Sequence, residues 1–275
     1  MATTYLTRTF GSGGSTTKWT YSVWLKRGNL SYDTANIFGR YQSSDYFTGL
    51  YFSGTDGIQF LQKHAGANAG RLMTSDIYRD VSGWYNIVAV WDTDNVTADD
   101  RMKIYVNGVS PTIINRINPS SGFGSTWNTA NPNNDIGRAD GMDGNTNYFD
   151  GSMSHIHFCD GYAYAASDFG EIDATTGEWK IKTSPSVSYG TTGFNILENG
   201  NSVTDQSGLG NNFTVGGGTL TNTEDCPSDI FATFNNLNNY WAGSTFSYGN
   251  TKVVTSSLSY AANLSTLGAS TGKFY

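Results

Sequence analysis

The stretch that decides the fold runs from Trp84 to Val109 and reads WYNIVAVWDTDNVTADDRMKIYVNGV. Successive residues of an extended chain point to opposite faces, and in the first eight positions both faces are largely apolar. This pattern predicts a strand that is buried on both sides. The charged segment from Asp92 to Asp100 follows, and a second strand is expected from Met102 to Val106. It ends at Asn107-Gly108, a pair that tolerates the positive φ angles of a type I′ hairpin turn.

The rest of the chain has the composition of an all-β protein. Only 14% of its 275 residues are charged, and Gly, Ser, Thr and Asn dominate the polar residues, which favours strands and turns over solvated helices. The first two strands, Thr4–Phe10 and Lys18–Lys26, are expected to pair as a hairpin. Gly193–Leu220 is expected to return and complete the same sandwich, and one helical turn is expected within Ala163–Gly177. Further strands are predicted at Asn36–Arg40, Tyr46–Ser53, Ile58–Lys63, Leu72–Ile77, Asp135–Arg138 and Tyr148–Asp160.

Several passages together resemble a known family. They are YLTRTF at residues 5–10, KWTYSVWLKRG at 18–28, KIYVNG at 103–108 and DIGR at 135–138. They resemble laminin G-like modules of the concanavalin A-like lectin/glucanase superfamily, in the form encoded by marine bacteriophages in virion or tail-fibre genes. The resemblance implies a jelly-roll β-sandwich of two antiparallel sheets over residues 1–225. Residues 226–275 are then a linker and a β-rich extension, or the start of a second, SPRY-like β-domain.

Charge and hydropathy narrow the partners. The formal net charge is −7 and no cluster of Lys or Arg is present, so binding to a nucleic-acid backbone is disfavoured. Residues 1–20 lack the apolar core of a secretion signal, and no apolar run approaches the ~20 residues of a membrane span. We therefore expect a protein that stays in the cytoplasm without membrane insertion. The phage-type resemblance implies assembly in a host cytoplasm and a place in the virion, with other virion proteins and copies of the chain as partners.

An acidic motif offers the one route to catalysis that the sequence suggests. Glu171-Ile172-Asp173 is similar to the E-x-D-x-x-E strand of superfamily glucanases, and retaining hydrolysis needs two carboxyl groups about 5–5.5 Å apart. The next glutamate is Glu178, beyond the turn residues Thr175-Thr176-Gly177. Because this spacing fails, the motif is predicted to be a solvated acidic loop and the protein is predicted not to be an enzyme.

Two loops are candidates for calcium, which prefers six to eight oxygen ligands. Asp92, Asp94, Asp99 and Asp100 do not fit an EF-hand and are predicted to form a solvated hairpin tip. Laminin G-like modules often hold calcium at one end of the sandwich, and the second loop crowds oxygen side chains there; ordinary turn residues are the alternative. Its candidate ligands are Asp140, Asp143, Asn145, Asn147 and Asp150. No other cofactor is predicted.

The remaining candidates are aromatic, histidine and cysteine side chains. Most aromatic residues occupy alternating strand positions and are predicted to be core. The histidines His64, His155 and His157 lack the pattern of a metal site and are predicted to be structural, and Cys159 and Cys226 are predicted to be free thiols. Four aromatic residues fall where loops are expected and are candidate glycan contacts: Trp127, Tyr148, Tyr240 and Trp241.

Three functions follow in order of preference. The first is a bacteriophage virion structural protein, a capsid decoration or a tail-fibre component, that displays a lectin-like sandwich without catalysis. The alternative is a receptor-binding protein that recognises host-surface glycan, and the remote alternative is a glycan hydrolase. The apolar residues after Asp225 cannot be buried by a segment of that size alone, so this segment is also predicted to contact a neighbouring subunit.

Overall fold

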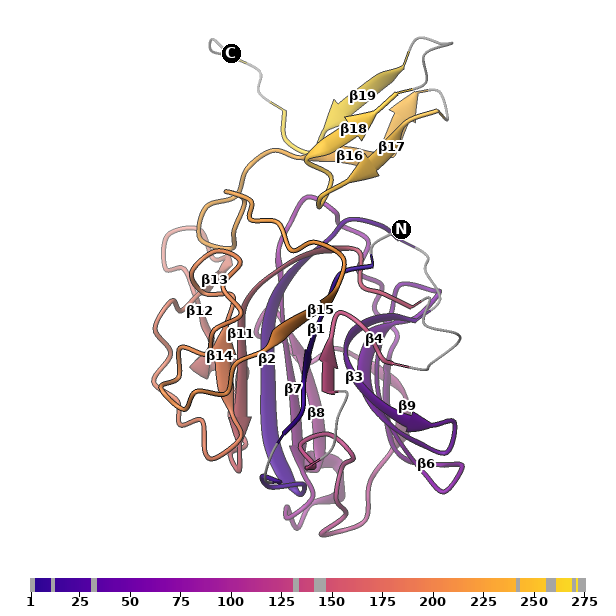
Figure 1. Cartoon of the computed structure of the whole chain (residues 1–275), viewed down its shortest axis with the longest axis vertical. Coiled ribbons are helices and arrows are strands. Elements are labelled where there is room, and N and C mark those ends of the chain that lie inside the picture. The colour runs from indigo at the N-terminus through magenta and orange to yellow at the C-terminus, as the bar shows by residue number, and fades with distance from the viewer. Residues whose placement is uncertain are drawn as a thin grey trace.

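The computed structural model describes residues 3–10, 13–30, 34–130, 134–140, 147–240, 243–255, 261–268 and 271. Two antiparallel sheets pack face to face, and a smaller β-rich segment lies over one end of them (Figure 1). The predicted all-β sandwich is therefore confirmed. In the part described, the larger sheet has eight strands in the order β15-β1-β10-β3-β4-β5-β6-β9, and the smaller has five in the order β14-β11-β2-β7-β8.

The strands of the larger sheet come mainly from the first half of the chain. They are β1 (Tyr5–Arg8), β3 (Ala35–Ser43), β4 (Tyr46–Phe52), β5 (Ile58–His64), β6 (Ala67–Thr74), β9 (Ile113–Ile117), β10 (Asn134–Ile136) and β15 (Thr214–Gly217). The smaller sheet consists of β2 (Lys18–Arg27), β7 (Tyr85–Asp92), β8 (Met102–Val106), β11 (Gly151–Asp160) and β14 (Phe194–Ile196).

Strand β7 is buried on both faces, as its sequence predicts. Ile87, Ala89 and Trp91 face the core between the sheets, where the Trp91 ring stacks on Trp19 at 6.3 Å. Val88 and Val90 point the other way and pack under a cap. The cap contains the short 3-10 helix η3 (Ala166–Asp168) and the hairpin of β12 (Gly170–Ile172) and β13 (Trp179–Ile181). The helical turn expected within residues 163–177 is thus η3.

The turn after β8 also has the predicted geometry. Asn107 and Gly108 both have positive φ, 48° and 78°. Val106 and Val109 exchange backbone hydrogen bonds of 2.9 and 3.0 Å around them, which closes a two-residue hairpin. At the other end of β8, the 3-10 helix η1 (Ala98–Asp100) carries the chain in from β7.

The expected hairpin between the first two strands is wrong. β1 lies in the larger sheet between β10 and β15, whereas β2 lies in the smaller sheet between β7 and β11. Both strands turn their apolar residues into one core, so alternation alone does not reveal that they belong to different sheets. The returning strands behave as predicted, because β14 and β15 form one edge of each sheet.

The C-terminal segment forms two small sheets in the residues described. β16 (Phe234–Tyr240) pairs with β19 (Ala262–Ser265), and β17 (Thr245–Ser247) pairs with β18 (Lys252–Val254). These strands lie beyond the end of the sandwich that carries the N-terminus (Figure 1). Both cysteines, Cys159 and Cys226, are free thiols as predicted. Across the described ranges, no helix is long and apolar enough to cross a membrane.

Candidate functional site

A cleft of about 930 Å³ lies where the C-terminal segment meets the sandwich. Its first wall is the start of β11 with the residues just before it, from Asp150 to His155. Its second wall is made by the loops that follow β14 and β15, residues 197–201 and 218–226. The third wall is the β17–β18 hairpin, through residues 246–249 and Lys252. The cleft has the size of a small-molecule or oligosaccharide site.

The first wall contains a β-bulge at His155. The pairing of β11 with β2 shifts register between Ser154 and His157, and His155 adopts a left-handed backbone with φ of 47°. Its backbone N–H donates to the carbonyl oxygen of Leu197 at 3.0 Å, and Leu197 is also left-handed, with φ of 57°. Such backbone conformations are uncommon for large side chains and often re-aim a residue at a functional site.

The imidazole of His155 is held inside this wall. Its Nδ1 lies 2.7 Å from Oγ of Ser154, and that hydroxyl donates to the carbonyl of Leu197 at 3.3 Å. Burial lowers the pKa of His155, while the carboxylate of Glu198 acts in the opposite direction. The net effect lowers the pKa of His155 below its ordinary value, so the ring is neutral at pH 7.

The third wall presents one tyrosine ring. Tyr248, Gly249 and Asn250 are consecutive left-handed residues at the hairpin tip, with φ of 54°, 61° and 64°. The turn leaves Tyr248 51% exposed although it lines the cleft. The ammonium of Lys252 lies 5.5 Å from the centre of its ring. A Cβ on Gly249 would lie 2.6 Å from Oγ of Ser152, so the hairpin tip approaches β11 closely.

A buried ion pair fixes the base of the C-terminal segment. Nζ of Lys26 lies 2.9 Å from Oδ2 of Asp225, and both side chains are about 5% exposed or less. Oδ1 of Asp225 accepts hydrogen bonds from Nε1 of Trp84 at 3.4 Å and from the backbone N–H of Phe231 at 2.9 Å. The side-chain amide of Asn250 adds a hydrogen bond of 3.0 Å to the carbonyl of Gly28. The third wall is thereby attached to β2.

The cleft carries more negative than positive charge. The carboxylates of Asp150, Glu198 and Glu224 line it, against the single ammonium of Lys252 among its described lining residues. Asp225 is neutralised by its ion pair with Lys26. Burial raises the pKa of Asp150. A negative potential of this kind disfavours an anionic ligand.

Neither Trp127 nor Tyr148, the two predicted glycan contacts whose side chains are described, lines this cleft. Trp127 is fully buried, with its ring 4.6 Å from that of Phe38, so the expectation that this loop residue offers a face to a ligand is wrong. Tyr148 is half-buried and its ring lies 6.1 Å from Tyr5. Tyr240 belongs to β16, and Trp241 lies outside the described residues.

Sequence reasoning missed Tyr248, Glu198 and His155. A signal was present for Tyr248, because it belongs to Ser-Tyr-Gly-Asn-Thr, whose Gly and Asn are typical of a tight turn. His155 was predicted to be structural because it was expected to share a strand face with His157 and no third metal ligand accompanies the pair in the sequence. The bulge breaks that alternation, and bulges leave little trace in sequence.

The described part of the predicted calcium loop does not show a ligand set. Oδ1 of Asp140 lies 3.3 Å from the guanidinium of Arg138, a neighbour that repels a metal cation. The backbone carbonyl of Asn147 accepts hydrogen bonds from Asn36, at 3.4 Å from its N–H and 3.1 Å from its amide. Asp143 and Asn145 lie outside the described residues. Where residues are described, no cluster of three or more His, Cys, Asp or Glu side chains could hold a metal. Calcium at Asp140, Asp143, Asn145, Asn147 and Asp150 stays a prediction.

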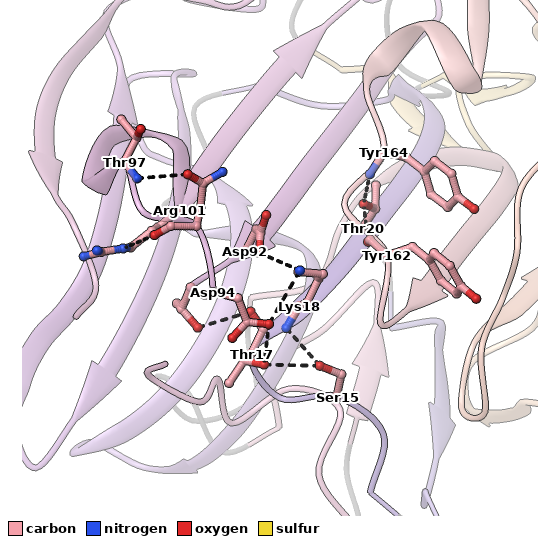
Figure 2. A network of polar contacts seen from close by, with 12 residues as sticks. Ser15, Thr17, Lys18, Thr20, Asp92, Asp94, Thr97, Arg101, Tyr162 and Tyr164 are labelled. Carbon is pink, nitrogen blue, oxygen red and sulfur yellow. Dashed lines mark hydrogen bonds and ion pairs between the residues drawn. The ribbon is translucent and has the colours of Figure 1, made fainter. Parts of the chain in front are cut away.

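The acidic segment after β7 is a hairpin tip with paired charges (Figure 2). Nζ of Lys18 lies between the carboxylates of Asp92 and Asp94, at 3.4 and 3.6 Å. Asp100 pairs with Lys103 at 3.1 Å. The predicted hairpin tip is confirmed.

Glu171 and Asp173 occupy the exposed β12–β13 hairpin of the cap. Nζ of Lys180 lies 3.4 Å from a carboxylate oxygen of each. Asp173 also accepts backbone hydrogen bonds from Thr176 and Thr175, which lower its pKa. The motif is on the surface as predicted, but only Asp173 lies in the turn, because Glu171 and Ile172 belong to β12 rather than to a loop.

Together these features define a lectin-like β-sandwich with a cleft at one end. Residues 2–167 match a laminin G-type family model described as concanavalin A-like lectin/glucanases superfamily, and the chain belongs to that superfamily. A comparison with curated proteins finds no match. Among solved structures, the chain is similar to a native heptameric SAP-like pentraxin from Limulus polyphemus. The identity is 17% over 59% of this chain and 71% of the pentraxin chain, with a TM-score of 0.41.

Proposed function

We propose that this chain is a structural protein of a bacteriophage virion, a capsid decoration or a tail-fibre component, and that its cleft binds a host-surface glycan without catalysis. The phage-type sequence passages support the virion role. Membership of the lectin superfamily supports glycan binding. The observation that carries glycan binding is the left-handed turn that holds an exposed Tyr248 ring against a polar cleft.

The chemistry of the cleft suits a sugar. A pyranose has one apolar face, which packs on an aromatic ring, and a rim of hydroxyls that need hydrogen-bond partners. Tyr248 offers the ring. Oxygen and nitrogen groups of Ser152, Asn199 and Asn201 line the same cleft and can meet the hydroxyls. Because several walls come from different parts of the chain, the site depends on the docked C-terminal segment.

The test is a glycan array probed with the full chain, followed by calorimetry on the strongest neutral oligosaccharide. Tyr248→Asn removes the ring and keeps a residue that tolerates positive φ, so it should fold normally and weaken binding at least tenfold. Tyr162→Asn is the matched control, because Tyr162 is an exposed tyrosine that does not line the cleft. An array without any hit at high micromolar protein would sink the glycan half and leave a structural role.

The C-terminal segment is the proposed contact with neighbours in the virion. Those neighbours are other virion proteins or further copies of the chain. Exposed apolar side chains concentrate in this segment, some of them on strands that pair with only one partner each among those described and the others in the adjoining loops. They are Ile230, Phe231, Leu237, Val254, Leu264 and Leu267. The location is tested by tracing this chain in an electron-microscopy map of purified particles. A map with every protein density assigned to other chains would contradict the virion role.

A further inference from the structure

His155 is held in an unusual way at the cleft wall. Its backbone is left-handed at the inserted position of the β11 bulge, and only 7% of its surface is exposed. A residue in that conformation carries backbone strain that glycine would avoid. Strain that persists in a binding wall suggests that the side chain is needed there.

The hydrogen bonds around the imidazole identify its tautomer. A serine hydroxyl has one proton, and Oγ of Ser154 donates it to the carbonyl oxygen of Leu197 at 3.3 Å. Both contacts of this hydroxyl are made together only when the same oxygen accepts from Nδ1–H of His155, 2.7 Å away, and we assign that tautomer. The neutral ring then carries its proton on Nδ1, and Nε2 is left as an acceptor.

Nε2 is the nitrogen available to a ligand. Nδ1 is occupied by Ser154, and no group among the described residues makes a hydrogen bond to Nε2. Nε2 is not among the fully buried polar atoms that lack a partner, so a hydroxyl of a ligand can donate to it at the cleft surface. His155 lines the cleft, so such a donor can reach it from there.

We propose that His155 is a sugar-binding residue whose Nε2 accepts a hydrogen bond from a hydroxyl of an uncharged glycan. The proposal rests on glycan binding in the cleft and deepens it by naming a residue and a ligand class. A carboxylate or phosphate group has no proton to donate to Nε2 at neutral pH. Such a group would also meet Glu198, whose charge acts on His155.

The main test is His155→Gly in the full chain. Glycine adopts φ of 47° without strain, so the variant should fold with a Tm equal to or above that of the unmodified protein. Binding of a neutral probe, the strongest among maltohexaose, mannohexaose and chitohexaose, should weaken about tenfold or more by calorimetry. Hexagalacturonate, the anionic probe, should bind more weakly than that neutral probe to the unmodified protein. His155→Asn, which also tolerates positive φ, serves if the glycine variant is unstable.

Ser154→Ala separates a positioning role from a direct one. Removing the hydroxyl frees Nδ1, so the nitrogen NMR shifts of His155 should change from those of a single Nδ1–H tautomer to a mixture. Probe binding should weaken by a smaller factor than in His155→Gly, because the ring remains.

The outcomes are distinct. A folded His155→Gly variant that binds the neutral probe as tightly as the unmodified protein overturns the role of His155 and leaves glycan binding intact. Equal or tighter binding of hexagalacturonate overturns the ligand class. If the unmodified protein binds no glycan at all, the proposed function fails and this inference fails with it.

Discussion

The ammonium of Lys26 and the carboxylate of Asp225 lie 2.9 Å apart inside the protein, although 199 positions separate them in the chain. This ion pair joins β2, in the middle of the smaller sheet, to the first residues of the C-terminal segment. A buried ion pair adds little net stability compared with apolar residues, but removal of one partner leaves a buried charge and costs about 3–5 kcal/mol.

Asp225→Ala should therefore release the C-terminal segment while the sandwich stays folded. Detachment lets Lys26 reach water, and this limits the loss to the docking energy of the segment. Hydrogen exchange should accelerate in residues 226–255 and stay slow in β2 and β7. The double variant Lys26→Met with Asp225→Leu should restore protection, and Asp229→Ala, at an exposed aspartate, is the control. Unchanged exchange in Asp225→Ala would contradict this role.

The stability of the protein should fall in mild acid because of His157. This imidazole is buried and its Nδ1 lies 2.9 Å from the Tyr189 hydroxyl; burial lowers its pKa to about 3. The unfolded chain takes up this proton near pH 6.5, whereas the folded chain does not, so the free energy of unfolding drops as pH falls between those values. The slope contributed by His157 approaches about 1.4 kcal/mol per pH unit.

Chemical denaturation of His157→Asn across pH 4–7 checks this prediction. In this variant, the slope of the free energy of unfolding against pH should lose the contribution of about one proton, whatever the absolute stability of the variant. His64→Asn, at an exposed histidine, should keep the full slope. An unaltered slope in His157→Asn would mean that this ring is not held neutral.

Gly108→Ala should be more destabilising than Gly122→Ala, although both glycines have similar positive φ, 78° and 71°. A Cβ at Gly108 would lie 2.5 Å from the Trp179 ring, whereas nothing lies within 4 Å of one at Gly122. We expect about 1–2 kcal/mol at Gly122 from backbone strain, and a further 1–3 kcal/mol at Gly108 from the clash. Equal losses in thermal unfolding would show that Trp179 moves aside freely.

Salt should strengthen the binding of anionic glycans and leave that of neutral glycans almost unchanged, because only the anionic ones are repelled by the charge of the cleft. Repulsion between Asp150, Glu198 and a carboxylated glycan is screened as ionic strength rises, so weak binding of the anionic glycan should strengthen from 20 to 500 mM salt, by roughly two- to fivefold. Binding of a neutral glycan should hardly change. Glu198→Gln should reduce this salt effect on the binding of the anionic glycan. Weaker binding of the anionic glycan at higher salt would contradict the prediction.

Local patterns in the sequence predict much of the fold. The alternation from Trp84 to Trp91 identifies a doubly buried strand, and Asn107-Gly108 identifies its turn, because both signals depend on neighbouring residues alone. The partner of β1 could not be predicted, because pairing across two sheets depends on contacts far along the chain. Trp127 was misplaced for a related reason. Its loop folds over the core, where Ser125 accepts a hydrogen bond from Nε1 of Trp19 at 2.9 Å.

The candidate site was less predictable than the fold. Its walls come from residues near 150, 200, 220 and 248, and no single segment shows a motif for them. The sequence around Tyr248 predicts a turn, but it does not indicate which part of the protein that turn faces. His155 depends on a bulge, and the extra residue of a bulge looks like any other strand residue until its partner strand is known.

The position of β1 between β10 and β15 has a consequence for how the protein is made. Leu6 pairs with Ile136 on one side and Val215 on the other, so β1 has no sheet neighbour until β10 has been translated and lacks its second neighbour until β15 has been translated. The β3–β6 meander can pair as soon as it emerges, because its contacts are local. Nascent chains therefore carry β1 unpaired until residue 136 has emerged and with one open edge until residue 217 has emerged, which exposes them to aggregation.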